Sequence, residues 1–174
     1  MRYVIRERLF RLGEDSDITD EQGQPVFHVD HPFVIFSLHA TFIVRDMVGT
    51  EVVRVKRANW KYALHATYRI TRQGEEVAEV RKKLFSPFVD RFTIDIPGPH
   101  DLQMTGSLFE HEYTITRDDQ VVATVSKRWL SLTETYGVET APDEDDVLIL
   151  ASVLALDLAE DREREERHER RDRD

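Results

Sequence analysis

The feature that most constrains the fold is an apolar segment near the C-terminus, residues 146–159, with the sequence DVLILASVLALDLA. Within it only Ser152 and Asp157 are polar, and there is no Gly or Pro. An acidic run, residues 143–146, begins the segment and suits a helix N-terminus, because its carboxylates oppose the partial positive charge there. A surface helix shows one apolar stripe, whereas this helix is apolar almost all round. It must therefore be buried on nearly every side.

The predicted helix is too short to span a lipid bilayer. Residues 147–159 form a helix about 20 Å long at 1.5 Å per residue, whereas a spanning helix needs about 20 apolar residues. The N-terminus alternates charged and apolar residues, unlike a signal or transit peptide. We therefore predict a core helix and no transmembrane segment.

Length and charge bound the remaining possibilities. A chain of 174 residues fits a single domain, which we place at residues 1–159. The tail, residues 160–174, has no apolar residue and either extends the helix through i,i+4 ion pairs or is disordered. The absence of Cys excludes disulfides and thiolate metal sites, and the net charge of −10 argues against nucleic-acid binding. We expect a cytoplasmic protein, peripheral to the inner membrane face if it binds lipid.

The most specific signal is a repeated β-hairpin. In one unit Tyr68 and Ile70 alternate with Arg69 and Thr71, the period-2 pattern of a half-buried strand. Turn residues follow, and then a second strand rich in Val. The five units span residues 18–31, 42–57, 68–86, 92–106 and 113–131, and the fourth is divergent.

The second strands have one apolar and one mostly polar face. The predicted core face holds Phe27, Val29, Val53, Val55, Ala78, Val80, Ala123 and Val125. The predicted outer face holds His28, Arg54, Glu79 and Thr124. Residues 3–11 and 135–139 add two strands and bring the total to twelve.

No helical pattern interrupts these strands, so their pairing should be antiparallel. Strands with one apolar face must curl around a core, and a barrel of about eleven strands has room for a helix. We therefore predict a mainly β fold, a twelve-stranded, antiparallel, closed barrel around helix 146–159.

Several separated segments resemble, in order, the LURP-one-related proteins of the tubby C-terminal-like superfamily. They are residues 1–10, 82–86, 91–95, 97–99, 111–113, 123–127, 135–138 and 145–150. The resemblance covers about residues 1–157 and implies a twelve-stranded barrel around a hydrophobic helix. It also implies a link to lipids, because tubby proteins bind phosphoinositides and the related scramblases act on phospholipids. No lipid-binding motif matches this sequence residue by residue, so no site residue is carried over.

A set of basic residues occupies one repeat position, two residues after a core valine in four units. They are His31, Arg57, Lys82 and Lys127, and Lys83 and Arg128 adjoin them on the alternate face. If the units lie side by side, this basic rim lies at one end of the barrel and could bind an anionic headgroup or phosphate. Two structural roles compete: the rim could neutralise residues 143–146, or its side chains could simply reach water.

His28 and Asp30 share a strand face and could together hold a metal ion. His28 aligns, however, with the outward positions of the other units, so we predict no metal site. The signatures of nucleotide-binding loops, zinc peptidases and serine hydrolases are absent. We therefore predict no cofactor and no catalytic residue.

These features favour a non-enzymatic binding module that engages anionic phospholipid headgroups or phosphorylated ligands through the basic rim. Phe88 and Trp129 are predicted to lie near that rim. The net charge of −10 opposes this reading, because a membrane reader needs a basic patch that overcomes bulk repulsion. The alternative is a soluble scaffold that binds a protein partner through its outer strand faces and charged tail. A phospholipid-handling enzyme is disfavoured, since neither a catalytic pair nor a spanning helix is evident.

Overall fold

The architecture is that of a computed structural model. It describes residues 1–6, 15–31, 41–58, 67–83, 89–107, 110, 112–126 and 135–171, with side chains up to residue 159. Within these ranges lie twelve strands and one helix. The elements are β1 (Arg2–Arg6), β2 (Ser16–Asp20), β3 (Pro25–Asp30), β4 (Thr41–Arg45), β5 (Glu51–Arg57), β6 (Thr67–Arg72), β7 (Glu75–Lys82), β8 (Asp90–Asp95), β9 (Leu102–Ser107), β10 (Glu112–Arg117), β11 (Gln120–Ser126), β12 (Thr135–Thr140) and α1 (Asp146–Arg171).

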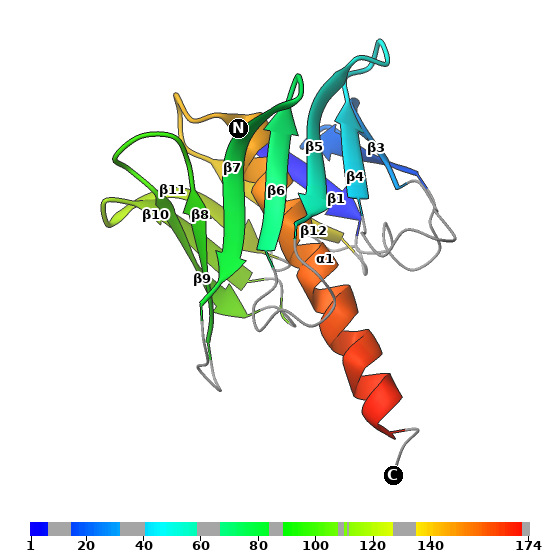
Figure 1. Cartoon of the computed structure of the whole chain (residues 1–174). Helices are drawn as coiled ribbons and strands as arrows, with labels where there is room; N and C mark the ends of the chain where they lie inside the picture. Colours follow the sequence, from blue (N-terminus) through cyan, green and yellow to red (C-terminus); the bar gives the residue numbers. More distant parts are fainter. Residues whose placement is uncertain are drawn as a thin grey trace.

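The strands form one closed barrel in which each strand pairs antiparallel with its neighbours in the chain (Figure 1). Closure comes from β1, which pairs with β12 from Arg2 opposite Glu139 to Arg6 opposite Thr135, and which also pairs with β2. The predicted twelve-stranded, antiparallel, closed barrel is confirmed.

The repeat seen in the sequence is also a repeat of backbone irregularity. The register shifts at one equivalent place in the first strand of four hairpins, after Ile18, Val44, Ile70 and Ile115. Bulges of this kind bend a strand and increase its twist. Four in equivalent positions help twelve strands curl into a closed wall.

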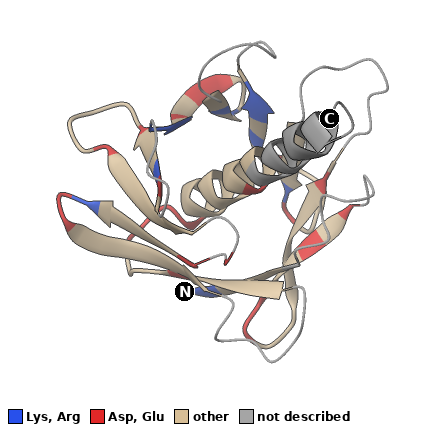
Figure 2. Ribbon diagram, turned by 90° about the horizontal axis from the view of Figure 1, so that it is seen from below, with Lys and Arg blue, Asp and Glu red and all other residues tan. Residues whose placement is uncertain are grey.

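Alternation along the strands divides core from surface as predicted. Val29, Val55 and Val80 are fully buried, whereas Arg69 and Arg81 on the other face are exposed. The inward side chains leave room for one helix, and α1 packs against β5, β6, β7 and β12. Figure 2 looks along the barrel and shows α1 inside the ring of strands.

Helix α1 begins with a side-chain cap. The Asp145 carboxylate accepts a hydrogen bond from the Leu148 backbone N–H at 3.0 Å, which satisfies a donor that has no partner within the helix. Residues 148–159 are all buried, and the Ser152 hydroxyl donates to the Leu148 carbonyl at 2.8 Å. The predicted core helix is therefore confirmed.

Beyond Ala159 the helix continues to Arg171 and extends out of the barrel (Figure 1). Of the two alternatives for residues 160–174, the helical extension holds for residues 160–171. The boundary predicted at residue 159 marks where the apolar sequence ends, and the helix itself does not end there.

The barrel has two distinct ends. The turns within the hairpins and the start of α1 lie at one end, which we call the turn end. The last residues of β3, β5, β7 and β11 lie at the opposite end, where α1 leaves the barrel, and we call this the exit end (Figure 1).

Candidate functional site

The predicted basic rim lies at the exit end. His31 follows β3, Arg57 and Lys82 end β5 and β7, and Lys83 follows β7. Because β3, β5 and β7 alternate with β4 and β6 in the barrel wall, these residues form an arc along one side of the exit end. Lys127 and Arg128, and the neighbouring Phe88 and Trp129, lie outside the described residues.

Each inward rim residue lies beside an aromatic residue of the next strand. Arg57 is opposite Tyr68, and Lys82 is opposite Phe92, with its ammonium 5.7 Å from the centre of the Phe92 ring. The His31 ring lies against Phe42, with 4.8 Å between ring centres. The aromatic residues are almost fully buried, whereas the rim residues are half-buried. A ring face attracts a cation and holds its stem in place.

The arc stops at β9 for a steric reason. Gly106 occupies the rim position of the divergent unit and is opposite Tyr113. A Cβ atom at this position would lie 2.7 Å from the Tyr113 side chain and would also overlap the Glu112 carbonyl oxygen. No side chain fits at Gly106. This rim position therefore retains its aromatic neighbour, Tyr113, but has no basic residue.

His31 is the member whose predicted charge needs correction. Burial lowers its pKa, and the opposing effect of Asp15 is smaller. The Nδ1 atom is buried and has no hydrogen-bond partner among the described residues, which favours the uncharged ring. His31 is therefore mainly neutral at pH 7, and the described cations of the rim are Arg57, Lys82 and Lys83.

The two lysines point to different faces, as the alternation predicts. Lys82 is half-buried, and its ammonium lies 3.0 Å from Asp90 Oδ1. Lys83 is exposed on the outer face and donates to Gln103 Oε1 at 2.6 Å. An anion that binds Lys82 must therefore share it with Asp90 or displace that carboxylate.

A buried carboxylate lies at the same end of the barrel. Asp157 on α1 is only 4% exposed and is the one buried acidic side chain among those described. It accepts a hydrogen bond from the hydroxyl of Tyr136, at the start of β12. Nearby, the Ser126 hydroxyl donates to Glu112 at 2.7 Å. The sequence marked Asp157 as polar within the apolar helix but gave it no role, because its partner lies far away in the chain.

The acidic run that begins α1 has its own partners at the turn end. Glu144 lies 2.5 Å from the Arg117 guanidinium, and Asp145 lies 2.9 Å from that of Arg72. Asp146 accepts a hydrogen bond from the Tyr3 hydroxyl at 2.7 Å. Burial, reinforced by Asp146, raises the pKa of Tyr3, so the phenol stays protonated.

These contacts correct one of the two structural roles considered for the basic rim. The rim does not neutralise Glu144, Asp145 or Asp146, since α1 enters from the opposite end of the barrel. Arg72 and Arg117, which occupy one repeat position beside the hairpin turns, form the ion pairs with the acidic run.

The arrangement suits recognition of an anion. Guanidinium and ammonium groups form charge-assisted hydrogen bonds to phosphate or carboxylate oxygens, and partial burial strengthens those bonds relative to bulk water.

Comparisons with known proteins agree with this architecture. A family model described as LURP-one-related matches residues 1–157. An uncharacterised Bacillus subtilis protein, YxjI, is 28% identical over 155 residues, which cover 88% of this chain and 90% of that protein. An Arabidopsis thaliana protein solved by X-ray crystallography superposes with a TM-score of 0.66 at 19% identity, covering 91% of this chain and 90% of the other. At that identity the Arabidopsis structure supports the fold alone. Within the described residues, no helix has the length and hydropathy to cross a membrane.

Proposed function

The chain belongs to the LURP-one-related family, and we propose that it is a non-enzymatic binding module for a phosphate-bearing anion, held at the basic rim. The observation that carries the proposal is the arc of half-buried basic residues on alternate strands, each beside a buried aromatic ring. A repeated pairing of this kind places several donors at one level of the barrel.

The two ends of the barrel support placing the site at the exit end. At the turn end, Arg72 and Arg117 are already paired with Asp145 and Glu144. At the exit end, Lys83 is exposed, and its ammonium donates to the neutral side-chain amide of Gln103. A ligand can approach such a cation without breaking an ion pair.

The path of α1 restricts how a ligand reaches the rim. The helix leaves through the same end and continues for residues 160–171, about 18 Å at 1.5 Å per residue. A flat membrane therefore cannot cover the whole exit end. It can reach the arc only from the side, next to the protruding helix. A phosphate group, free or on a protruding lipid headgroup, can reach the β5–β7 side beside the helix.

Vesicle co-sedimentation tests the proposal directly. Neutral phosphatidylcholine vesicles and vesicles containing phosphatidylserine are compared at low and high salt, with wild type beside the Lys82/Lys83/Lys127/Arg128→Ala variant. Each Lys or Arg near an anionic surface contributes about 1 kcal/mol, so the variant should bind anionic vesicles up to about 1000-fold more weakly. A thermal-shift titration with inorganic phosphate distinguishes a free phosphate from a lipid headgroup.

A matched control removes four cations from the outer wall, in the Lys56/Arg69/Arg81/Arg91→Ala variant. All four are exposed, so the change in net charge is the same while the rim stays intact. Equal loss of binding in the two variants would mean that net charge alone matters and that there is no site at the rim. An absence of both vesicle and phosphate binding in the wild type would refute the proposal.

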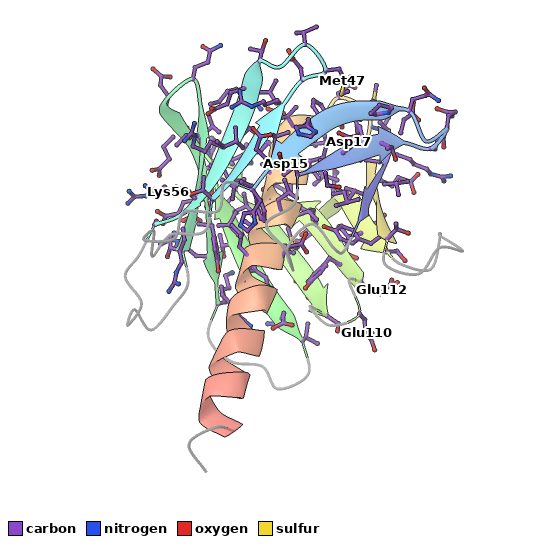
Figure 3. All side chains as sticks on the ribbon, turned by 90° about the vertical axis from the view of Figure 1, so that its right-hand side faces the viewer. Asp15, Asp17, Met47, Lys56, Glu110 and Glu112 are labelled. Carbon is purple, nitrogen blue, oxygen red and sulfur yellow. The ribbon has the colours of Figure 1, made fainter. Side chains whose placement is uncertain are left out.

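A second candidate, a protein-interaction scaffold, is favoured by apolar side chains at the turn end. Met47 and Val48 in the β4–β5 turn are 52% and 87% exposed, and Figure 3 shows Met47 at this turn. Two adjacent exposed apolar side chains on one turn can contact another protein. Affinity capture with wild type and with a Met47/Val48→Ser variant tests this candidate, because a partner that uses this surface must be lost from the variant.

A further inference from the structure

A second cluster of chemically active groups lies on the outer wall of the barrel, on the β2–β3 hairpin. Asp17 is opposite His28 in the antiparallel register, and Asp15 and Asp30 lie two residues from them along the chain. Because side chains alternate along a strand and Ile18 and Val29 face the core, these four side chains share the outer face. Figure 3 shows Asp15 and Asp17 on this hairpin.

The imidazole of His28 is oriented by a carboxylate. Its Nδ1 atom lies 2.8 Å from Asp17 Oδ1, so Nδ1 carries the proton that Asp17 accepts when the ring is neutral. The lone pair of Nε2 is then available on the opposite side of the ring. Histidine ligands of metal ions commonly have this arrangement, in which a second carboxylate fixes the tautomer and the ring orientation.

The Nε2 side of the ring meets the Asp30 carboxylate, and the Asp15 carboxylate lies close to this pair. The Nε2 atom lies 3.3 Å from Asp30 Oδ1, and one ligand atom from each of Asp15, His28 and Asp30 lies within 4.8 Å of the others. Two ligands at about 2.0–2.1 Å from a tetrahedral Zn²⁺ lie about 3.4 Å apart. The spacing between His28 Nε2 and Asp30 Oδ1 already matches this value, and the Asp15 carboxylate must move closer to join them around one ion.

The local charge also matches a divalent ion. Asp15, Asp17 and Asp30 contribute three negative charges, and Arg45 contributes one positive charge through its Nε atom, 2.6 Å from Asp30 Oδ2. Three minus one leaves a charge of −2 around a neutral His28. Arg45 binds Oδ2 and leaves Oδ1 directed at the imidazole, so it orients the carboxylate without occupying the proposed ligand atom.

We propose that His28 Nε2, Asp30 Oδ1 and an oxygen of Asp15 bind one divalent transition-metal ion, with Asp17 positioning the imidazole. An imidazole with two carboxylates suits Zn²⁺ or Mn²⁺. His28 and Asp17 are partly exposed, at 39% and 48% of their side-chain surface, so water completes the coordination sphere. None of the proposed ligands belongs to the basic rim, although the backbone N–H of the rim residue His31 donates to Asp15 at 3.2 Å.

Calorimetric titration of the metal-free protein with ZnCl₂, and separately with MnCl₂, tests the site. Wild type should bind one ion that His28→Gln and Asp30→Asn each weaken at least 10-fold. Asp17→Asn should weaken binding by about 10–100-fold, the usual effect of losing a carboxylate that orients a ligand. Each variant is first shown to melt like wild type in the presence of a chelator, because all three side chains lie on the surface.

His100→Gln is the matched control. His100 in the β8–β9 turn also pairs with a carboxylate, that of Asp118 in the β10–β11 turn, at 2.7 Å, but no third ligand atom joins the pair among the described residues. The control should bind the metal as wild type does. The proposal is overturned if wild type shows no saturable binding, or if binding survives His28→Gln unchanged.

Discussion

The two ends of the barrel are built from the same repeat but use their charged residues differently. At the turn end Arg72 and Arg117 occupy one repeat position and pair with acids that begin α1. At the exit end Arg57 and Lys82 occupy another repeat position and lie beside aromatic rings. The same kind of side chain thus anchors the helix at one end and lies beside an aromatic ring at the other. A basic residue in a repeat acquires its role from its neighbours, and the repeat alone does not define it.

The turns explain why only two units supply an arginine to the helix. In the β2–β3 and β4–β5 hairpins the equivalent position is Asp20 or Asp46, whose carboxylate accepts backbone N–H groups of its own four-residue turn. The β6–β7 turn has two residues, Gln73 and Gly74, with positive φ angles of 54° and 86°. Such a tight turn needs no side-chain cap, so Arg72 is free to reach Asp145.

The largest expected effect comes from disrupting α1, the helix that runs from the turn end to the exit end of the barrel. Leu154 is completely buried on α1, and Leu154→Asp places an unpaired charge in the core, which costs several kcal/mol. Because a domain of this size is stable by only about 5–15 kcal/mol, the variant should not fold, as measured by circular dichroism. Leu150→Asp should behave in the same way, whereas Val48→Asp, at a position 87% exposed, should fold normally. A Leu154→Asp variant with a wild-type melting curve would contradict the central-helix architecture.

The next prediction compares the loss of one tyrosine hydroxyl at the exit end with the same loss at the turn end. Tyr136→Phe removes a hydrogen bond to the buried Asp157, and Tyr3→Phe removes one to the half-buried Asp146. Losing a hydrogen bond to a buried carboxylate costs about 1–3 kcal/mol, whereas Asp146 keeps its hydrogen bond from the Thr140 hydroxyl and is partly open to water. Denaturant titration should therefore show a larger loss of unfolding free energy for Tyr136→Phe. Equal losses would mean that the two ends are equally open to water.

Most of the fold follows from the sequence because it depends on local patterns. Period-2 alternation in residues 68–71 predicts a strand, and an apolar segment without Gly or Pro predicts a buried helix. The gap in the basic rim, at Gly106, also falls in the fourth unit, which the sequence already marks as divergent. These signals are strong because burial is the largest favourable term in folding.

The contacts within the candidate site could not be predicted in the same way. Asp157 and Tyr136 are 21 residues apart, and Tyr3 and Asp146 are 143 residues apart, so their contacts depend on closure of the barrel. Cross-strand register could have revealed that Asp17 faces His28, but it is set by a bulge after Ile18 that no residue type announces. The lowered pKa of His31 depends on depth of burial, which alternation along a strand does not specify near its end.

A smaller effect distinguishes the arginines that anchor α1 from the proposed anion site. Arg72→Ala and Arg117→Ala remove ion pairs whose arginines are 37% and 30% exposed. Such pairs contribute at most about 1 kcal/mol each, and less at high salt. The double variant should therefore lose a little stability, most clearly at low salt, and should retain the anion binding of wild type. Loss of vesicle or phosphate binding in this variant would show that the anion site is not confined to the exit end.

The smallest effect is a pH dependence that originates at His31. Burial lowers its pKa in the folded state, so between that lowered value and the unfolded value of about 6.5 the unfolded chain binds more protons. Unfolding free energy should therefore fall as pH falls below about 6.5, and His31→Gln should remove that part of the slope. His28 acts in the opposite direction, because its hydrogen bond to Asp17 raises its pKa, and its contribution to stability is lost as pH rises.

Measuring the effect of His31→Gln in both wild-type and His28→Gln backgrounds, in the presence of a chelator, isolates the contribution of the rim histidine. If the slope below pH 6.5 is unchanged in both backgrounds, His31 is as open to water as the outer wall and can carry charge, and the rim then gains the fourth cation that its repeat position implies.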